Sequence, residues 1–179
     1  MSSKFKVQSS KFWVLAIFFL QLGCSIPNLA STQCSQASDV VKEFYSYHFG
    51  NDKEMGFLRE NVAKKDKFFT PEFNKLMSYE FDREDKFVKE NPNEVPFMSG
   101  DPFTNSSEYP TSFRVGNCRL EEPNRIIVQV LMLWKSENHE EQREMNVEVV
   151  KQREKWLIND FVDENKESLR QVFNREKYR

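Results

Sequence analysis

The stretch "RIIVQVLMLWKS", residues 125–136, decides the fold class of this chain. Successive side chains of an extended strand point to opposite faces of a sheet. Here both faces are largely apolar, because the set from Ile126 to Trp134 alternates with a second set from Ile127 to Leu133. A strand that is apolar on both faces is typical of the interior of a sheet covered on both sides. We therefore expect residues 125–136 to form a central strand.

Three further stretches with a period of two surround this strand. We expect strands at 112–121, 143–152 and 155–163. The charged sequence "SENHEEQ", residues 136–142, separates the second strand from the third, and "REKW", residues 153–156, turns the next corner. Short connections of this kind join antiparallel neighbours. The sequence therefore predicts a four-stranded antiparallel sheet.

Apolar residues at helical spacing precede the sheet. We expect one helix from Ser38 to about Phe49 and a shorter one over 53–64. A long helix follows, which Thr70 caps and Pro71 begins, since proline is tolerated in the first turn. These elements make up the N-terminal half of the domain.

A loop and a last helix complete the predicted fold. Residues 91–111 read as a loop and hold four of the seven prolines. After the strands, Asn165 is the expected cap of a short C-terminal helix. Helices followed by a meander of strands indicate an α+β fold, with the helices packed on one face of a curved four-stranded antiparallel sheet. Such a sheet would give the domain a cone-like shape.

The first 25 residues have the pattern of an export signal. Three lysines precede nine uninterrupted apolar residues, 12–20, and small residues follow them. A basic start, a short apolar core and a small-residue end are typical of a secretory signal. The apolar run is about half the length that a spanning helix needs. We expect export to the periplasm or cell envelope, or secretion.

The end of this signal leaves two alternatives open. Gly23-Cys24 resembles the end of a bacterial lipoprotein signal, in which Cys24 would carry the lipid, but Gln21 stands where that motif favours Leu. Cleavage after Ser25 also places small residues where an ordinary signal peptidase needs them. Residues 26–37 are polar and uncharged, which predicts a flexible linker before a single domain over 38–179.

Composition limits the range of partners. Removal of three lysines with the signal takes the formal charge from −2 to −5. An acidic chain argues against a nucleic-acid surface, which needs clustered basic residues. It also argues against electrostatic docking on anionic lipid, so membrane contact is expected only through the signal or a lipid anchor.

Two cysteines fall within the mature chain. Cys34 and Cys118 would meet an oxidising compartment after export, where they can pair. A disulfide between them would attach the linker to the first strand. The sequence does not give their separation, so separate reduced thiols stay the alternative.

Two aspartates are weak catalytic candidates. Asp101 precedes Pro102, and aspartate before proline usually forms a turn. Asp160 shares an expected strand face with large apolar residues, where burial would raise the pKa of a general base. Arg114 on the first strand is a possible partner for either acid.

Other site chemistry is sparse. The two histidines, His48 and His139, lie far apart and have no zinc-ligand spacing, and only five glycines are present. We expect neither a metal nor a cofactor. Should the domain enclose an apolar cavity, four residues are expected to line it: Tyr109, Arg114, Trp134 and Trp156.

Three local stretches carry a family resemblance: "FFTPEFNKLM", "SGDPF" and "KWLINDFVDENKESLRQ". They resemble an uncharacterised family of bacterial exported and lipoprotein domains in the nuclear transport factor two-like (cystatin-like cone) superfamily, over residues 38–175. The resemblance implies a cone fold and an envelope location but no activity. Superfamily relatives include a steroid isomerase and a dehydratase, whose catalytic motifs this sequence does not match.

The sequence therefore favours an exported, non-enzymatic binding or interaction module. Its partner would be a small apolar ligand or an envelope protein. One alternative is a cone-fold enzyme, an isomerase, dehydratase or hydrolase, that uses Asp160 or Asp101 as base. Another is an envelope immunity or inhibitor protein that contacts its target through the loop of residues 97–110.

Overall fold

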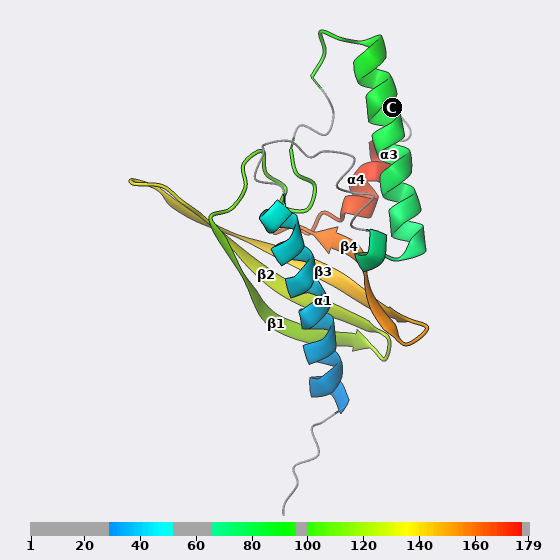
Figure 1. The fold of residues 1–179 in the computed structure, drawn as a ribbon, viewed down its shortest axis with the longest axis vertical. Coiled ribbons are helices and arrows are strands. Elements are labelled where there is room, and N and C mark those ends of the chain that lie inside the picture. The colour runs from blue at the N-terminus through cyan, green and yellow to red at the C-terminus, as the bar shows by residue number, and fades with distance from the viewer. Residues whose placement is uncertain (1–28, 52–65, 96–99, 177–179) are drawn as a thin grey trace, which may run out of the picture.

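The computed structural model describes residues 29–51, 66–95 and 100–176, and it has the predicted α+β fold (Figure 1). The elements in chain order are α1 (Leu29–Asn51), the 3-10 helix η1 (Asp66–Phe68), α3 (Pro71–Glu90), β1 (Ser112–Glu122), β2 (Arg125–Lys135), β3 (Glu140–Gln152), β4 (Lys155–Val162) and α4 (Leu169–Glu176). The expected signal (1–25), Cys24 and the expected helix over 53–64 lie outside the described residues.

The four strands form one antiparallel sheet in the order β1-β2-β3-β4. The predicted strands are confirmed, with the largest difference at β3, which begins at Glu140 instead of residue 143. The reason is a tight turn, in which the backbone N–H of Ser136 donates to the carbonyl of His139 at 2.8 Å. Because of this turn, the residues from Glu140 to Gln142 also pair with β2.

Strand β2 is internal, as its sequence predicts, but its two faces differ. The set from Ile126 to Trp134 is buried, and the set from Ile127 to Leu133 is half-buried. Only the first set belongs to the hydrophobic core. The expectation that β2 is covered on both sides is therefore wrong for the described part of the chain.

Helix α3 confirms its predicted signals. Thr70 Oγ1 accepts a hydrogen bond from the backbone N–H of Phe73 at 3.2 Å, and Pro71 is the first helical residue. Asn91 follows the last turn and donates its N–H to the Phe87 carbonyl at 2.8 Å. The C-terminal half of α3 extends beyond the sheet (Figure 1).

Helix α1 begins nine residues earlier than expected, at Leu29 instead of Ser38. The predicted flexible linker over 26–37 is therefore wrong from Leu29 onward. Tertiary contacts order this polar stretch: Ala37 is fully buried, and Gln36 Oε1 accepts a hydrogen bond from Trp156 Nε1 at 3.1 Å. A short polar sequence does not reveal such contacts.

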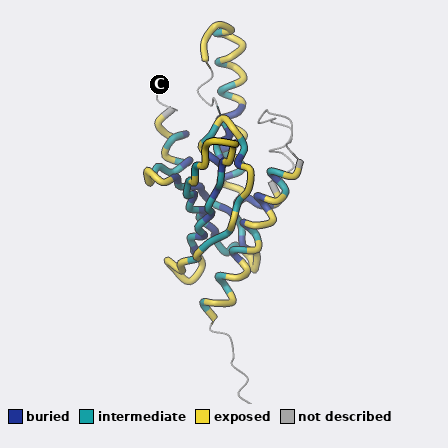
Figure 2. Tube along the Cα trace, turned by 90° about the vertical axis from the view of Figure 1, so that its left-hand side faces the viewer, coloured by how far each residue is buried: buried dark blue, intermediate teal, exposed yellow. Residues whose placement is uncertain are grey.

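Buried residues gather where the helices meet the sheet (Figure 2), and many of them are aromatic. Phe44 of α1 is fully buried, and its ring lies 5.1 Å from Phe103 and 5.4 Å from Phe161, centroid to centroid. Phe103 comes from the loop after α3, and Phe161 comes from β4. The core therefore fixes this loop against the sheet. Among the described residues, no helix is long and apolar enough to cross a membrane.

Candidate functional site

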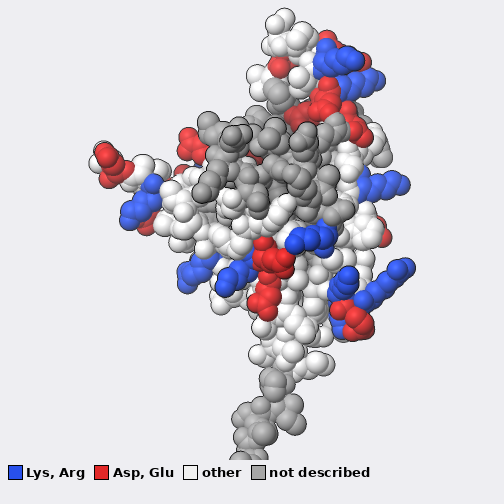
Figure 3. Space-filling view, in the orientation of Figure 1, with Lys and Arg blue, Asp and Glu red and all other residues white. Residues whose placement is uncertain are grey.

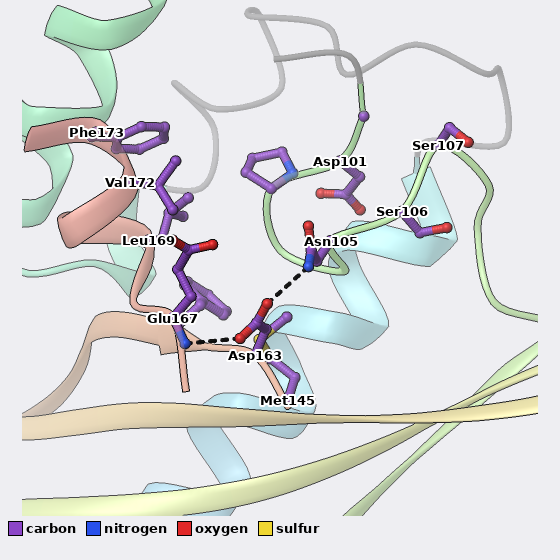
Figure 4. A pocket seen from close by; sticks show the side chains of 13 residues that line it. Asp101, Asn105, Ser106, Ser107, Met145, Asp163, Glu167, Leu169, Val172 and Phe173 are labelled. Atoms are coloured by element: carbon purple, nitrogen blue, oxygen red, sulfur yellow. Dashed lines mark hydrogen bonds between the residues drawn. The ribbon is translucent and has the colours of Figure 1, made fainter. Parts of the chain in front are cut away.

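A pocket of about 300 Å³ opens between the loop of residues 100–107 and the C-terminal helix α4 (Figure 4). Its floor is formed by Met145 of β3 and Phe161 of β4, and α4 contributes Leu169, Val172 and Phe173. Polar side chains stand on the other walls: Asp101, Asn105, Ser106, Ser107, Asp163 and Glu167. The pocket therefore has both apolar and polar walls.

The loop of residues 100–107 closes on itself around Asp101. The Asp101 backbone N–H donates to the Ser106 carbonyl at 2.8 Å, and Asp101 Oδ1 accepts from the N–H of Phe103 at 2.9 Å. A Cβ atom on Gly100 would lie 2.7 Å from the Ser106 oxygen, so this position needs glycine. Asp101 thus has the turn-forming role expected of aspartate before proline.

The other carboxylate oxygen of Asp101 contacts a buried histidine. His48 Nε2 and Asp101 Oδ2 are 2.5 Å apart, with His48 0% and Asp101 7% exposed. The imidazole stacks on Phe44 at 5.7 Å and meets Phe103 edge-on at 5.4 Å. This contact ties α1 to the wall of the pocket. The sequence places His48 on an apolar helix face but does not reveal its partner, 53 residues away.

Tyr45 of α1 supports the same loop through Phe103. Its hydroxyl donates to the Phe103 carbonyl at 2.8 Å, and the side chain is fully buried. Burial, and then the negative charge of Asp101, raise the pKa of Tyr45 well above its usual value. The hydroxyl therefore stays protonated and acts as a donor.

Asp163 holds the facing wall. Its Oδ1 accepts from the backbone N–H of Glu167 at 2.9 Å, and its Oδ2 accepts from Asn105 Nδ2 at 3.0 Å (Figure 4). Asn105 stands in the left-handed backbone region with φ 49°, which asparagine tolerates. The second bond therefore links the two walls of the pocket. Neither Asn105 nor Asp163 shows a sequence signal that predicts a hydrogen bond between them.

The titratable side chains in the pocket lining are all acidic. Asp101, Asp163 and Glu167 line it, and none of its lining residues is Lys or Arg. Arg175 pairs with Glu167 but is itself outside the lining. On the face of the molecule seen in Figure 3, acidic and basic side chains are otherwise interspersed.

Asp160 does not line the pocket, and the predicted face for it is wrong. One extra residue in β4 makes a bulge between the pairs Val149–Ile158 and Val147–Phe161. The bulge reverses which side chains of β4 point to which face of the sheet, so Phe161 points to the core. Asp160 instead faces the other side of the sheet.

Asp160 organises the start of α4. Its Oδ1 accepts from the backbone N–H groups of Phe161 and Arg170 at 2.9 and 3.2 Å, and its Oδ2 accepts from the Ser168 hydroxyl. Ser168 and Gln171 bond each other's backbone N–H groups, which makes a capping box. Ser168 is therefore the cap of the last helix, and the prediction of Asn165 is wrong by three residues. Burial raises the pKa of Asp160, although the Ser168 hydrogen bond opposes this shift.

The four expected cavity residues do not line this pocket. Tyr109 packs edge-on against His48, Trp134 Nε1 donates to the Glu108 carbonyl at 2.9 Å, and Trp156 binds the N-terminal half of α1. Arg114 is exposed on β1 opposite Leu131, and Asp101 pairs with His48 instead of with an arginine. The three aromatic residues among them therefore serve packing within the fold.

Cys34 of α1 and Cys118 of β1 form a disulfide, with their Cα atoms 5.8 Å apart. The pairing that the sequence leaves open is thus present, although Cys34 belongs to a helix and not to a linker. Among the residues that the structure describes, no group of three His, Cys, Asp or Glu side chains could hold a metal ion. His139 is exposed at the tip of the β2–β3 hairpin.

Comparisons with known proteins assign no family. No family model and no curated protein matches this chain. The chain is similar to the crystal structure of a protein of unknown function from Bacteroides thetaiotaomicron, with a TM-score of 0.46 and 18% identity, over 74% of this chain and 93% of that one. At this level the similarity assigns neither a superfamily nor a function. Membership of the cone superfamily stays a prediction.

Proposed function

We propose that this chain is an exported, non-enzymatic binding module whose pocket holds a small amphipathic cation. The observation that carries the proposal is the pocket between the 100–107 loop and α4, which has three carboxylates on its walls, no basic lining residue and an apolar floor. A largely preformed cavity with few polar groups is the usual form of a small-molecule site. The ligand would place an amine near the carboxylates and a short apolar body over Phe161.

The charge of the ligand follows from desolvation. Asp101 and Asp163 are 7% and 9% exposed, so their interactions with a bound group are weakly screened by water. A second anion in this pocket would add like-charge repulsion. A cation would gain from both carboxylates, and the volume of about 300 Å³ limits it to a small molecule.

The hydrogen bonds of these carboxylates favour binding over catalysis. Both oxygens of Asp101 and both oxygens of Asp163 already take part in hydrogen bonds that shape the pocket walls. The Ser106 hydroxyl likewise accepts from the Glu108 backbone N–H at 3.2 Å. A general base must be able to reach a substrate proton, and these groups serve the local structure instead.

Two observations support export. The N-terminal 25 residues have the pattern of a secretory signal. The disulfide between Cys34 and Cys118 belongs to the oxidising compartments where such bonds persist. Attachment through a lipid on Cys24 and free secretion both agree with these observations.

The test compares two probes of similar length and opposite charge, hexylamine and hexanoate. We expect hexylamine to raise the melting temperature of the protein and hexanoate to leave it unchanged at pH 7. A ligand present at one hundred times its Kd adds about 2.7 kcal/mol to the stability, which corresponds to about 5 to 10 °C for a chain of this size.

Two variants on α4 locate the effect. Val172→Trp fills the pocket and should abolish the shift, whereas Asn174→Trp adds the same side chain at an exposed position outside the pocket lining. Equal shifts with both probes, or an unaltered response of Val172→Trp, would show that the pocket does not bind the amine.

A second candidate function is an enzyme that uses Asp101, and the His48–Asp101 contact of 2.5 Å favours it. A carboxyl at a pocket wall that is backed by a buried imidazole can exchange a proton with a bound substrate. In that case Asp101→Asn would abolish turnover of a substrate while leaving its binding in place. For a binding module, Asp101→Asn would weaken the hexylamine response instead.

A further inference from the structure

The outer face of the sheet carries apolar side chains that no described core group covers. Ile127, Leu131 and Leu133 of β2 are half-buried and lie outside the hydrophobic core cluster and its packed neighbours. The core side of the same strand is fully buried against the helices. An apolar stripe along an internal strand is a feature of sheet faces that pack on another protein surface.

Charged residues flank this stripe in two matching rows. In the first row, Arg114 of β1 pairs in register with Leu131, and Leu131 pairs with Glu144 of β3. In the second row, Arg119 of β1 pairs in register with Ile127 of β2, and Ile127 pairs with Glu148 of β3. Each row therefore runs from a base on β1, through an apolar residue on β2, to an acid on β3.

Neighbouring polar side chains donate hydrogen bonds to the two glutamates of these rows. Glu144 accepts from Gln129 Nε2 at 2.8 Å and from Asn146 Nδ2 at 2.9 Å. Glu148 accepts from Asn159 Nδ2 at 2.6 Å. Carboxylates that neighbours already orient lose less side-chain freedom when they bind a partner.

This order makes the face complementary to itself. A two-fold axis that lies between two such faces, parallel to β2, places β1 of one chain over β3 of the other at the same height along the strands. Arg114 then meets Glu144 of the second copy, and Arg119, which pairs with Glu121 in its own chain, meets Glu148. One dimer therefore places four pairs of opposite charge across the interface. Leu131 and Ile127 meet their own copies on the axis. Closed two-fold interfaces pair one patch with itself in this way.

We propose that the outer face of the sheet binds a second copy of this chain, face to face, around that two-fold axis. Arg125 lies on the same strand at one end of the face, and it is already neutralised by Glu122 at 2.8 Å and Glu148 at 3.3 Å. It therefore approaches its own copy with its positive charge offset by these two carboxylates. Pairing through the β1 edge is less favourable, because a register shift between Val115 and Cys118 interrupts that strand.

The test uses sedimentation equilibrium on protein expressed from the 179-residue sequence, from about 1 to 100 µM, the range of moderate protein–protein affinities. We expect the wild type to dimerise. Arg114→Glu and Glu144→Arg should each weaken the dimer at least tenfold, because each places two like-charge pairs in the interface. Lys75→Glu, the same charge change at an exposed site on α3, is the matched control and should have no effect.

A mixture of the two variants tests whether lost charge complementarity, and not a damaged fold, weakens the dimer. In a dimer of one Arg114→Glu chain with one Glu144→Arg chain, both contacts of that row again join opposite charges. The mixture should therefore dimerise more tightly than either variant alone. A monomeric wild type, a dimer that neither variant weakens, or a mixture that stays monomeric would overturn the proposal.

Discussion

At the scale of single residues, the two histidines of the chain lie in opposite environments. His48 is fully buried among aromatic rings and contacts Asp101, whereas His139 is exposed and lies 3.7 Å from Glu141. Removing one member of a buried polar pair leaves the other without compensation in a medium of low dielectric. The same removal at the surface exposes the remaining group to water.

We therefore predict that His48→Ala lowers the free energy of unfolding by about 3 kcal/mol, from the lost pair and the cavity together. His139→Ala is the control and should unfold at the same urea concentration as the wild type. The midpoint and slope of urea unfolding measure both variants. Equal midpoints for the two variants would mean that the His48–Asp101 contact does not stabilise the fold.

The buried carboxyl of Asp160 predicts a dependence of stability on pH. Burial raises its pKa in the folded state, so the folded protein holds this proton more tightly than the unfolded chain does. The stabilising contribution is full below the unfolded pKa of about 3.9. It is lost as the pH rises through the higher pKa of the folded state.

Asp160→Asn removes this titration and keeps a side chain that can accept from Phe161 and Arg170. The free energy of unfolding of the wild type should therefore fall relative to that of the variant as the pH rises from about 3.5 to 7. Urea unfolding at several pH values measures it. A difference that stays constant with pH would contradict the raised pKa.

At the scale of elements, the disulfide fixes the N-terminal half of α1 to β1. It joins residues 84 positions apart, and a cross-link over a loop of this length restricts the unfolded chain strongly. Cys34 lies in the part of α1 that the sequence predicts as a linker. The bond therefore anchors a helical segment whose own sequence gives it little helical stability.

We predict that a reducing agent lowers the stability of the wild type by about 2 to 5 kcal/mol. The double variant Cys34→Ser/Cys118→Ser should start at the lower value and not respond to the reducing agent. Thermal unfolding with and without dithiothreitol measures both. If the wild type keeps its melting temperature when its thiols titrate as reduced, the cross-link does not stabilise the fold.

At the scale of the whole molecule, one sheet separates two surfaces with different chemistry. The inner side holds the aromatic core and, at the end near α4, the acidic pocket. The outer side presents the charged and apolar rows that we propose as a dimer interface. Since the two surfaces lie on opposite sides of the sheet, a second copy on the outer face would leave the pocket open.

Export is a property of the whole chain, and its mass tests it. Protein recovered from the membrane fraction of its native cells should lack the first residues and begin either at a lipid-bearing Cys24 or at Ile26. Intact-mass spectrometry distinguishes these two forms. A chain that retains Met1 and resides in the cytosol would contradict the proposed export.

The sequence by itself determined the elements whose signals are local. Alternation placed all four strands, and Thr70 with Pro71 placed the start of α3, because side-chain periodicity and caps depend only on neighbouring residues. The α+β class followed from the order of these elements. The turn at Asp101 was also readable, since its bonds close within a few residues.

Only the tertiary structure decided the pocket, the start of α1 and the place of Asp160. His48 reaches Asp101 across 53 residues, Asn105 reaches Asp163 across 58, and Cys34 reaches Cys118 across 84. A single bulged residue in β4 moved Asp160 to the opposite face of the sheet. These features depend on which distant segments pack together. The residues that make such contacts do not recur at a regular spacing, so no periodic pattern in the sequence reveals them.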